Sequence, residues 1–566
     1  MNAKQIWEQC EQLYSKRSTL MMQWQDIALN FYPARADFTF QRSLGMELVS
    51  DLMSSWPLLC QRRLADAIGQ MLRPTAKAWF ESGLANGKKL DVEGKQWLQK
   101  ADCAMRAAMY APAAWFTDAT KAGDNDFATF GQTVIHVGMT RRRDNLLYRC
   151  YHLRDCVWME DEDRQFCLVG RKWKPNARTL VNTFGSNVHA DVAKLMNGAQ
   201  PSPFAEIDCV HMVVHQDMYN GTFTGPQNKA CPFVSIFYDQ AHDQVMEAIT
   251  VWNRGYIIPR WQTPGSSQYA FSPATVIGLP EARLLQSMTY TLLEAGEKAT
   301  NPPLIATGDV VRGDVATYAG GITVVDREYD ERLGDALRPI TQDLRGLPLG
   351  EKMQMDSREI LTQVFYLDTL KGPQQGGPQM TAFEVGQLVQ QYIRDALPLF
   401  EPMEMGYNGA IYHETFDICQ RNGLFGSPFD RPRSLMGQST EPTFRSPLHD
   451  AINQAQVQVF QGSMALVAQA VQADPSMAGI IDYGIALPDA LEGNSTPETW
   501  IRSKTEMLAI QKKQQQAQSS ANTLAEMQSA ANVAKTVSDA RSSGQMDQTR
   551  MTGQTATPAA PQAVPA

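Results

Sequence analysis

The sequence predicts an α+β fold, in which helical segments flank a central block of antiparallel strands. Apolar residues between Trp7 and Phe31 recur at three- and four-residue steps, which is the spacing of an amphipathic helix. From Phe127 to Trp261 the pattern changes to short β-branched and aromatic runs, separated by Gly, Asn, Asp and Pro with no regular helix between them. After Pro280 the helical spacing returns. Strands that follow one another without intervening helices favour an antiparallel sheet over a βαβ alternation.

The composition excludes several classes of protein. The 566 residues allow three or four domains at roughly 150 residues each. No apolar run reaches about 18 residues, the length that spans a membrane, and Met1–Glu8 lacks the apolar core of a signal peptide, so we expect a cytosolic start. The net charge of −9 argues against binding nucleic acid over the whole surface, so any DNA contact would be local. Nine cysteines, scattered from Cys10 to Cys419, predict buried reduced thiols.

The N-terminal half is expected to contain three helices followed by strands. The first is a long helix that ends at Pro33, the second covers about 48–72 and stops near Pro74, and the third covers about 94–109. The strands are expected at 132–137, 146–151, 156–159, 166–169, 209–215 and 233–238.

Two helices of similar length flank a strand-and-turn region after Pro280. Pro280 suits the first position of a helix, and Pro302-Pro303 stop that helix after Asn301. Twenty helical residues at 1.5 Å each make a rod of about 30 Å. A second helix is expected from about Glu351 to Leu370, after strands and turns between them.

A glycine-rich loop and a longer helix follow. Residues 371–379 contain three glycines and no apolar anchor, which predicts a mobile loop. Thr381 opens a helix with capping-box spacing, Pro398 and Pro402 should bend it, and Asn422-Gly423 should end it. Further helices are expected at about 448–473 and 497–537, and a disordered tail rich in Gln, Thr, Pro and Ala at 541–566.

No recognisable catalytic motif is present. Gly83–Lys89 resembles a phosphate-binding loop, but it is one residue short between the glycines and has Lys89 where Ser or Thr should bind Mg²⁺. The sequence lacks Gly-x-Gly-x-x-Gly, Gly-x-Ser-x-Gly and His-Glu-x-x-His. We therefore expect no enzyme, no catalytic residue and no cofactor, and a hydrolase with an unrecognised site is the least favoured alternative.

Three polar clusters are better explained as ordinary structure than as binding sites. His211 and His215 share one face of a strand but have no third ligand nearby in the sequence, so no metal is expected there. Arg141–Arg143 predicts a solvated turn, with a phosphate or partner contact as the alternative. The third cluster matches no zinc-site spacing and consists of Cys150, His152, Cys156 and Cys167.

Seven short segments, none of them specific alone, follow one another in an order shared with a known protein family. They are Leu64–Leu72 with Trp79-Phe80, Ile258–Trp261, Ser272–Ala274 with Leu279-Pro280, Glu297–Leu304, Ala319–Val324, Met380–Val385 and Ser446–Leu448. Over about residues 5–510 this order resembles the portal, or head-to-tail connector, of short-tailed, T7-like bacteriophages. The chain departs from that family at Tyr269–Phe271, where a Tyr-Gly-Arg-like turn is more common, and after Arg541.

The resemblance implies a ring-forming portal fold, with twelve copies around a tunnel at one capsid vertex. Its parts, in chain order, would be an α/β wing (1–279), a first stem helix (280–301), a small β-containing clip (302–349), a second stem helix (350–370), a tunnel loop (371–379), a long wing helix (380–445), a helical crown (446–540) and a disordered tail (541–566).

The same resemblance implies the function and the partners. Double-stranded DNA would be packaged and ejected through the ring. The protein would be located in the virion and, during assembly, in the host cytoplasm. The clip would dock the terminase large subunit, which supplies ATP hydrolysis, and then the tail adaptor. Capsid and scaffolding proteins, and internal core proteins, would be further partners. The alternative is an intracellular helical adaptor or scaffold without a DNA channel.

Candidate site residues follow from these assignments. The tunnel loop would present Lys371, Gly372, Gln374, Gln375, Gly376 and Gly377 to DNA; the stem lining would include Glu294, Lys298, Lys352 and Arg358; the clip contacts would include Arg312, Asp314, Arg327 and Arg332. Repeated in a ring, Lys371 would either contact DNA or remain a solvated loop lysine, and both readings stay open. Residues 304–347 carry eight acidic side chains against five arginines, the opposite of a phosphate-binding groove.

Overall fold

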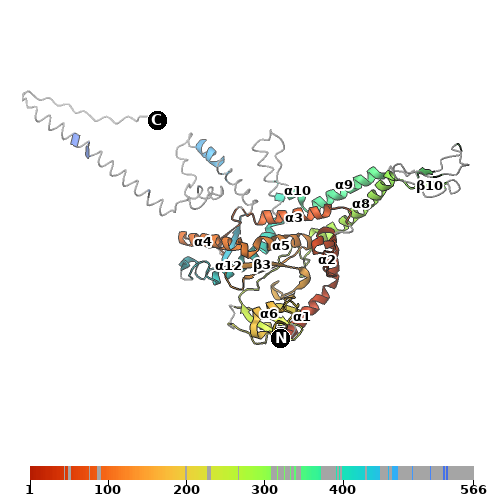
Figure 1. The fold of residues 1–566 in the computed structure, drawn as a ribbon. Helices are drawn as coiled ribbons and strands as arrows, with labels where there is room; N and C mark the ends of the chain where they lie inside the picture. The colour runs from red at the N-terminus through yellow and green to blue at the C-terminus, as the bar shows by residue number, and fades with distance from the viewer. Residues whose placement is uncertain are drawn as a thin grey trace, which may run out of the picture. The chain divides into compact units, whose positions relative to one another are not determined.

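The computed structural model describes most of the chain up to residue 445. Described are residues 1–306 except 44, 49–51, 76, 86–90, 198–200, 226–230 and 266, then 337–339, 346–370, 398–427, 430–445 and 462–469, with isolated positions elsewhere. The chain divides into two compact units, Met1–Ile481 and Asp482–Ala566. The first unit is described below (Figure 1). None of the described helices is long and apolar enough to cross a membrane.

The first 31 residues form two helices, so the prediction of one long helix is wrong. Arg17 separates α1 (Ala3–Lys16) from α2 (Ser18–Phe31). Its buried guanidinium donates hydrogen bonds of 2.6 Å to the backbone oxygens of Arg154 and Cys156. These bonds hold Arg17, where the two helices meet, next to a strand that begins at Cys156, far away in the sequence. The expected end before Pro33 is confirmed, because α2 stops at Phe31.

Three helices follow, of which two were expected. α4 (Val92–Met109) confirms the third predicted helix, and Asp91 caps it by accepting from the Gly94 amide. α3 (Trp56–Leu72) ends where predicted but does not begin at residue 48, because the amides of Met53 and Ser54 donate to the side-chain oxygen of Gln286 instead. α5 (Phe116–Phe130) was not predicted from the sequence.

A five-stranded sheet confirms the antiparallel prediction. Its strands pair in the order β4-β5-β6-β7-β8, and every pairing is antiparallel. The expectation that no helix interrupts these strands is wrong, because α6 (Ala177–Phe184) and α7 (Ala190–Asn197) connect β5 to β6. The strands are β4 (Cys156–Glu160), β5 (Phe166–Trp173), β6 (Cys209–His215), β7 (Phe233–Asp239) and β8 (Gln244–Val251).

Two smaller sheets complete the body of the unit. β2 (Val134–Met139) lies between β3 (Leu146–Tyr151) and β9 (Tyr256–Ile257). β1 (Phe80–Leu84) pairs with β12 (Thr440–Phe444), which joins two distant parts of the chain. Gly83, the first glycine of the segment that resembles a phosphate-binding loop, lies within β1 opposite Glu441, and the last four residues of that segment lie outside the described residues.

The long helix expected at 381–422 is described from residue 398 onward. A π-helical turn, Glu404–Gly409, follows Pro402 and leads into α12 (Ala410–Arg421). Gly423 has a φ of +74°, which confirms the predicted glycine stop. Of the later predictions, only 462–469 in the expected 448–473 helix form a described helical stretch. The 497–537 helix and the tail lie outside the described residues apart from isolated positions.

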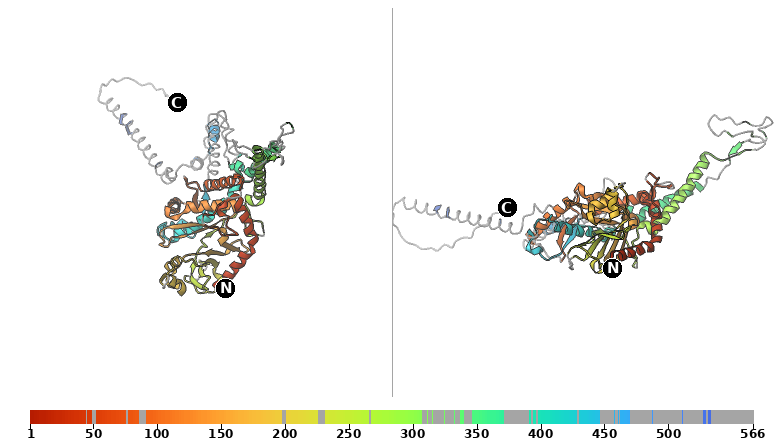
Figure 2. Two further views of the ribbon diagram at one scale, coloured as in Figure 1. Left: turned by 45° about the vertical axis from the view of Figure 1, so that its right-hand side comes forward. Right: turned by 60° about the horizontal axis from the view of Figure 1, so that its bottom comes forward.

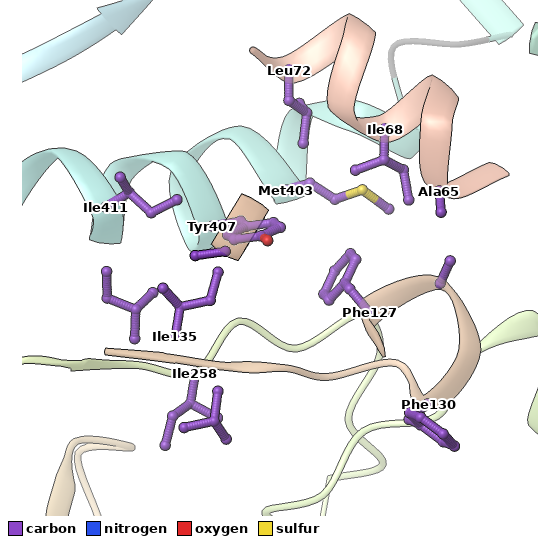
Figure 3. Close-up of a cluster of buried hydrophobic side chains, with 14 of the residues drawn as sticks. Ala65, Ile68, Leu72, Phe127, Phe130, Ile135, Ile258, Met403, Tyr407 and Ile411 are labelled. Atoms are coloured by element: carbon purple, nitrogen blue, oxygen red, sulfur yellow. The ribbon is translucent and has the colours of Figure 1, made fainter. Parts of the chain in front are cut away.

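One large apolar core holds the unit together. It joins α2, α3, α5, the β2 sheet and α12, and Figure 3 shows its centre. There Tyr407 and Ile411 point toward Phe127 of α5 and Ile135 of β2. A second cluster packs α1 against the five-stranded sheet, and a third packs α6 and α7 against one end of that sheet.

Replacing Gly131 by alanine is expected to destabilise this core strongly. Gly131 has a φ of +74°, and an added Cβ would lie 2.5 Å from the backbone carbon of Phe271. Gly423 has the same φ with nothing within 4 Å of such a Cβ, so Gly423→Ala is the matched control for backbone strain alone. We expect Gly131→Ala to lower the free energy of unfolding by at least about 2 kcal/mol more than the control, measured by urea denaturation. Equal losses of unfolding free energy in Gly131→Ala and Gly423→Ala would refute the close packing of Gly131 against Phe271.

Candidate assembly interface

Two helices, α8 (Leu279–Thr300) and α9 (Leu347–Val364), form an antiparallel hairpin that carries β10 at its far end (Figures 1 and 2). At 1.5 Å per residue they are about 33 and 27 Å long. The predicted pair of similar helices is therefore confirmed. The second begins at Leu347, earlier than expected, with Pro348 in its first turn. It also breaks at Tyr366, whose φ is +56°, before α10 (Leu367–Leu370).

The base of the hairpin is fixed to the core. Leu279 and Leu285 of α8 and Leu361 of α9 are buried, and the ring of Phe365 packs 5.3 Å from that of Phe31. Gln286 also donates to the backbone oxygen of Ser54 at 2.8 Å, besides accepting from two amides there. Hydrogen bonds and apolar packing together set the direction in which the hairpin leaves the body of the unit.

Beyond its base the hairpin is held mainly by contact between its own helices. Gln354 donates a hydrogen bond to the hydroxyl of Thr289 at 2.8 Å. Gly350 lies so close to Leu292 that an added Cβ would come within 2.8 Å of a leucine methyl. The residues facing across are thus Leu285, Thr289 and Leu292 on α8, and Gly350, Gln354, Ser357 and Leu361 on α9.

Large apolar side chains lie exposed on both sides of this contact. Successive helical residues are rotated by about 100°, so residues just before and just after the facing positions point to opposite sides. Because the helices are antiparallel, the residues just after the facing positions share one side and those just before share the other. The first flank consists of Tyr290, Leu293 and Met355, and the second flank of Leu284, Leu349, Met353 and Ile360.

The exposure of these flanks is high for such residues. Met355 is 67% exposed, Leu349 64%, Tyr290 56% and Leu293 53%. Several large apolar side chains exposed together on one hairpin are typical of a surface used for association. The sequence analysis identified neither flank. The available signal was the pair of apolar residues Tyr290 and Leu293, which lie on α8 beside the positions that face α9.

The predicted lining residues are only partly brought together. On α8, the ammonium of Lys298 lies 2.5 Å from the carboxylate of Glu294, as an exposed pair one turn apart. Lys352 is exposed on α9, whereas Arg358 is half-buried near the base, where its backbone oxygen accepts from the Trp56 indole at 3.1 Å. Each helix carries three acidic and two basic side chains, so the hairpin is weakly acidic.

Most of the other predicted site residues lie outside the described residues. These are Lys371, Gly372, Gln374, Gln375, Gly376, Gly377, Arg312, Asp314 and Arg327. Arg332 is described and exposed. In the same region β10 (Leu304–Ala306) pairs antiparallel with β11 (Leu337–Pro339), with Ile305 opposite Arg338.

The polar clusters singled out in the sequence have structural partners. His211 lies between the Tyr256 hydroxyl at 2.6 Å and the Ser235 hydroxyl at 2.8 Å, and burial lowers its pKa well below the usual value. Arg141–Arg143 form the exposed turn between β2 and β3, as expected. Six of the nine cysteines are buried, but Cys103 is exposed, so the prediction of buried thiols is wrong there.

Comparison with known proteins finds a matching family and a similar portal protein. Residues 3–501 match the family model described as bacteriophage head to tail connecting protein. The portal protein of Salmonella phage epsilon15 is 21% identical over 381 residues, which is 66% of this chain. The match also covers 66% of the length of that relative, just under two thirds.

Proposed function

Because the chain belongs to the family of bacteriophage head-to-tail connecting proteins, components of the virion that link capsid and tail, we propose that twelve copies close into a ring at one capsid vertex and conduct double-stranded DNA. The observation that carries this proposal is the pair of apolar flanks on the α8–α9 hairpin. A single chain leaves both flanks in water, so each flank needs a neighbour.

Two different flanks on one hairpin favour a closed ring over a dimer. In a two-fold dimer the same patch meets itself, and the opposite patch stays exposed. If the first flank of one copy packs on the second flank of the next, every copy uses both flanks. When the rotation between neighbouring copies brings the last copy back to the first, the ring closes and no flank stays exposed. The hairpins of a ring built in this way would stand side by side around its axis.

A ring of hairpins would give a channel wall that does not hold DNA tightly. Each hairpin has two more acidic than basic side chains, so twelve copies would have an excess of about 24 acidic groups. A wall rich in Lys and Arg would release many counterions on binding DNA and so bind it firmly. The acidic excess, with Lys298 paired to Glu294, suits a duplex that must slide.

The segments at the two ends of the hairpin supply the partner contacts in this proposal. The region between the two helices, residues 301–346, which includes the exposed Arg332, would dock the terminase large subunit and later the tail adaptor. The loop 371–379 would meet DNA, and the chain after 446 would face capsid, scaffolding and internal core proteins.

The mass of the purified assembly tests the proposal. Twelve chains of 63.0 kDa make about 756 kDa, and light scattering after size exclusion should give a single species near that value. A monomer or a two-fold dimer would overturn the ring and would favour the helical adaptor instead.

Deleting Gly372–Pro378 is expected to leave the ring intact but to impair DNA packaging or retention, because these residues would form the contact with the duplex. The measurement is the amount of DNA per particle assembled with the deleted chain, beside particles carrying the intact chain. Normal genome filling would remove the loop from the mechanism.

A further inference from the structure

Three side chains of types that can ligate a metal ion lie together on the first unit, outside the hairpin. One possible ligand atom from each of His189, Asp191 and His242 lies within 4.8 Å of the other two. Two imidazoles and one carboxylate are a donor set that binds Zn²⁺ and related ions. The metal-like patterns singled out in the sequence involve none of these residues.

Two elements bring the cluster together. His189 and Asp191 form a His-Ala-Asp sequence at the start of α7, and His242 lies in the turn between β7 and β8. The side chain of Gln244 donates to the backbone oxygen of Asn187 at 2.9 Å, which ties the two elements together. Val188 and Val192 are buried beside Met246 under this contact.

His242 is oriented by a buried carboxylate. Asp239 is fully buried, and its Oδ2 lies 2.8 Å from Nδ1 of His242. Its Oδ1 accepts from the amides of Ala241 at 3.0 Å and His242 at 3.3 Å, so the carboxylate is fixed in place. A ring that donates from Nδ1 to this carboxylate carries its lone pair on Nε2. Metal-ligating histidines are usually held by a carboxylate in this way.

Asp191 offers a carboxylate with one oxygen to spare. Lys194 donates to its Oδ1 at 2.7 Å, while Oδ2 lies 3.6 Å from Nδ1 of His189. The rings of His189 and His242 are stacked, with centroids 4.3 Å apart and planes 16° from parallel. Because imidazole lone pairs lie in the ring plane, His189, which is half-exposed, must turn for both lone pairs to converge on one ion.

We propose that His189, Asp191 and His242 bind one divalent transition-metal ion, with Zn²⁺ the expected occupant. Asp239 acts as a positioning residue for His242. With water in the fourth place the ion would be tetrahedral. It would join the α6–α7 insertion to the β7–β8 turn, in addition to the hydrogen bond from Gln244 to Asn187 and the small apolar cluster beneath it.

Zn²⁺ and Co²⁺ titrations of the full-length chain, freed of any affinity tag and of bound metal, test the site. Calorimetry should find one Zn²⁺ site per chain that is lost in His242→Ala and in Asp191→Asn. Co²⁺ should give the visible absorption of a tetrahedral complex. Asp239→Asn should weaken Zn²⁺ binding roughly 10- to 100-fold.

His215→Ala is the matched control. His215 is similarly exposed and lies 3.2 Å from the carboxylate of Asp217, but it belongs to no such group of three in the described chain. Zn²⁺ binding should be unchanged in this variant. Because Asp191 is exposed, we expect Asp191→Asn to stay folded. This variant therefore still tests the site if His242→Ala or His215→Ala unfolds. Failure of the intact chain to bind Zn²⁺, or equal binding by Asp191→Asn and the intact chain, would overturn the proposal.

Discussion

Replacing Met353 by glutamate is expected to leave the chain folded but to prevent ring formation. Met353 is 48% exposed in the single chain and lies on the second flank of the hairpin. If the flank is covered by the next copy, the variant buries an unpaired carboxylate at every contact of the ring, which costs several kcal/mol each time. Light scattering should then show mainly single chains of 63.0 kDa at micromolar concentration.

Met22→Glu is the control, because Met22 is 57% exposed on α2 rather than on the hairpin. It should assemble normally, and both variants should keep the circular dichroism of the intact chain.

Leu293→Glu, on the first flank, should also fail to assemble alone. Mixed with Met353→Glu it should yield a pair, because one intact first flank then meets one intact second flank. Full rings from either variant would show that the hairpin is not the interface.

Replacing Arg73 by methionine is expected to cost about 3–5 kcal/mol of folding free energy, because it leaves a buried carboxylate without its cation. Arg73 ends α3 and is ion-paired with Asp124 of α5, both being buried. Its other nitrogen donates to the side chain of Asn408 at 2.7 Å, next to α12. The guanidinium carbon also lies 4.6 Å from the centre of the Tyr407 ring. Urea denaturation followed by tryptophan fluorescence measures the loss.

Arg62→Met in the same helix is the matched control. Arg62 lies 4.0 Å from Asp66 at the surface, and its loss should cost well under about 1 kcal/mol. Burial raises the pKa of Asp124, and Arg73 opposes this rise. Without Arg73 the carboxyl protonates more readily in the folded state than in the unfolded state, so the deficit should shrink as the pH falls. Arg73→Met/Asp124→Asn should recover part of the loss. A deficit as small as that of Arg62→Met would show that the Arg73–Asp124 pair does not stabilise the fold.

The sequence predicted the elements whose signals are local. The strands at 146–151 and 209–215 match the structure residue for residue, and the prolines on both sides of α8 mark its ends to within one residue. The break at Arg17 could not be predicted, since the apolar spacing continues through it and its partners lie more than 130 residues away. α5 was missed because it is rich in small and polar residues. One of them, Gly123, lies so close to Ile135 and Tyr407 that a Cβ would come within 2.8 Å of either.

The candidate sites were less predictable than the fold. Lys298 and Glu294 sit one turn apart, so their pairing follows from the sequence. The two flanks depend on which face of α8 meets α9, and periodicity alone does not reveal the partner. The cluster of His189, Asp191 and His242 depends on docking of the α6–α7 insertion against a turn about 50 residues later. No ligand spacing in the sequence indicates that these residues come together.

If identical copies close around an open axis, end-on views of the purified full-length protein in the electron microscope will show it. We expect rings with twelve-fold symmetry and a continuous central opening lined by the α8–α9 hairpins. Compact particles with no opening along any axis would contradict this expectation.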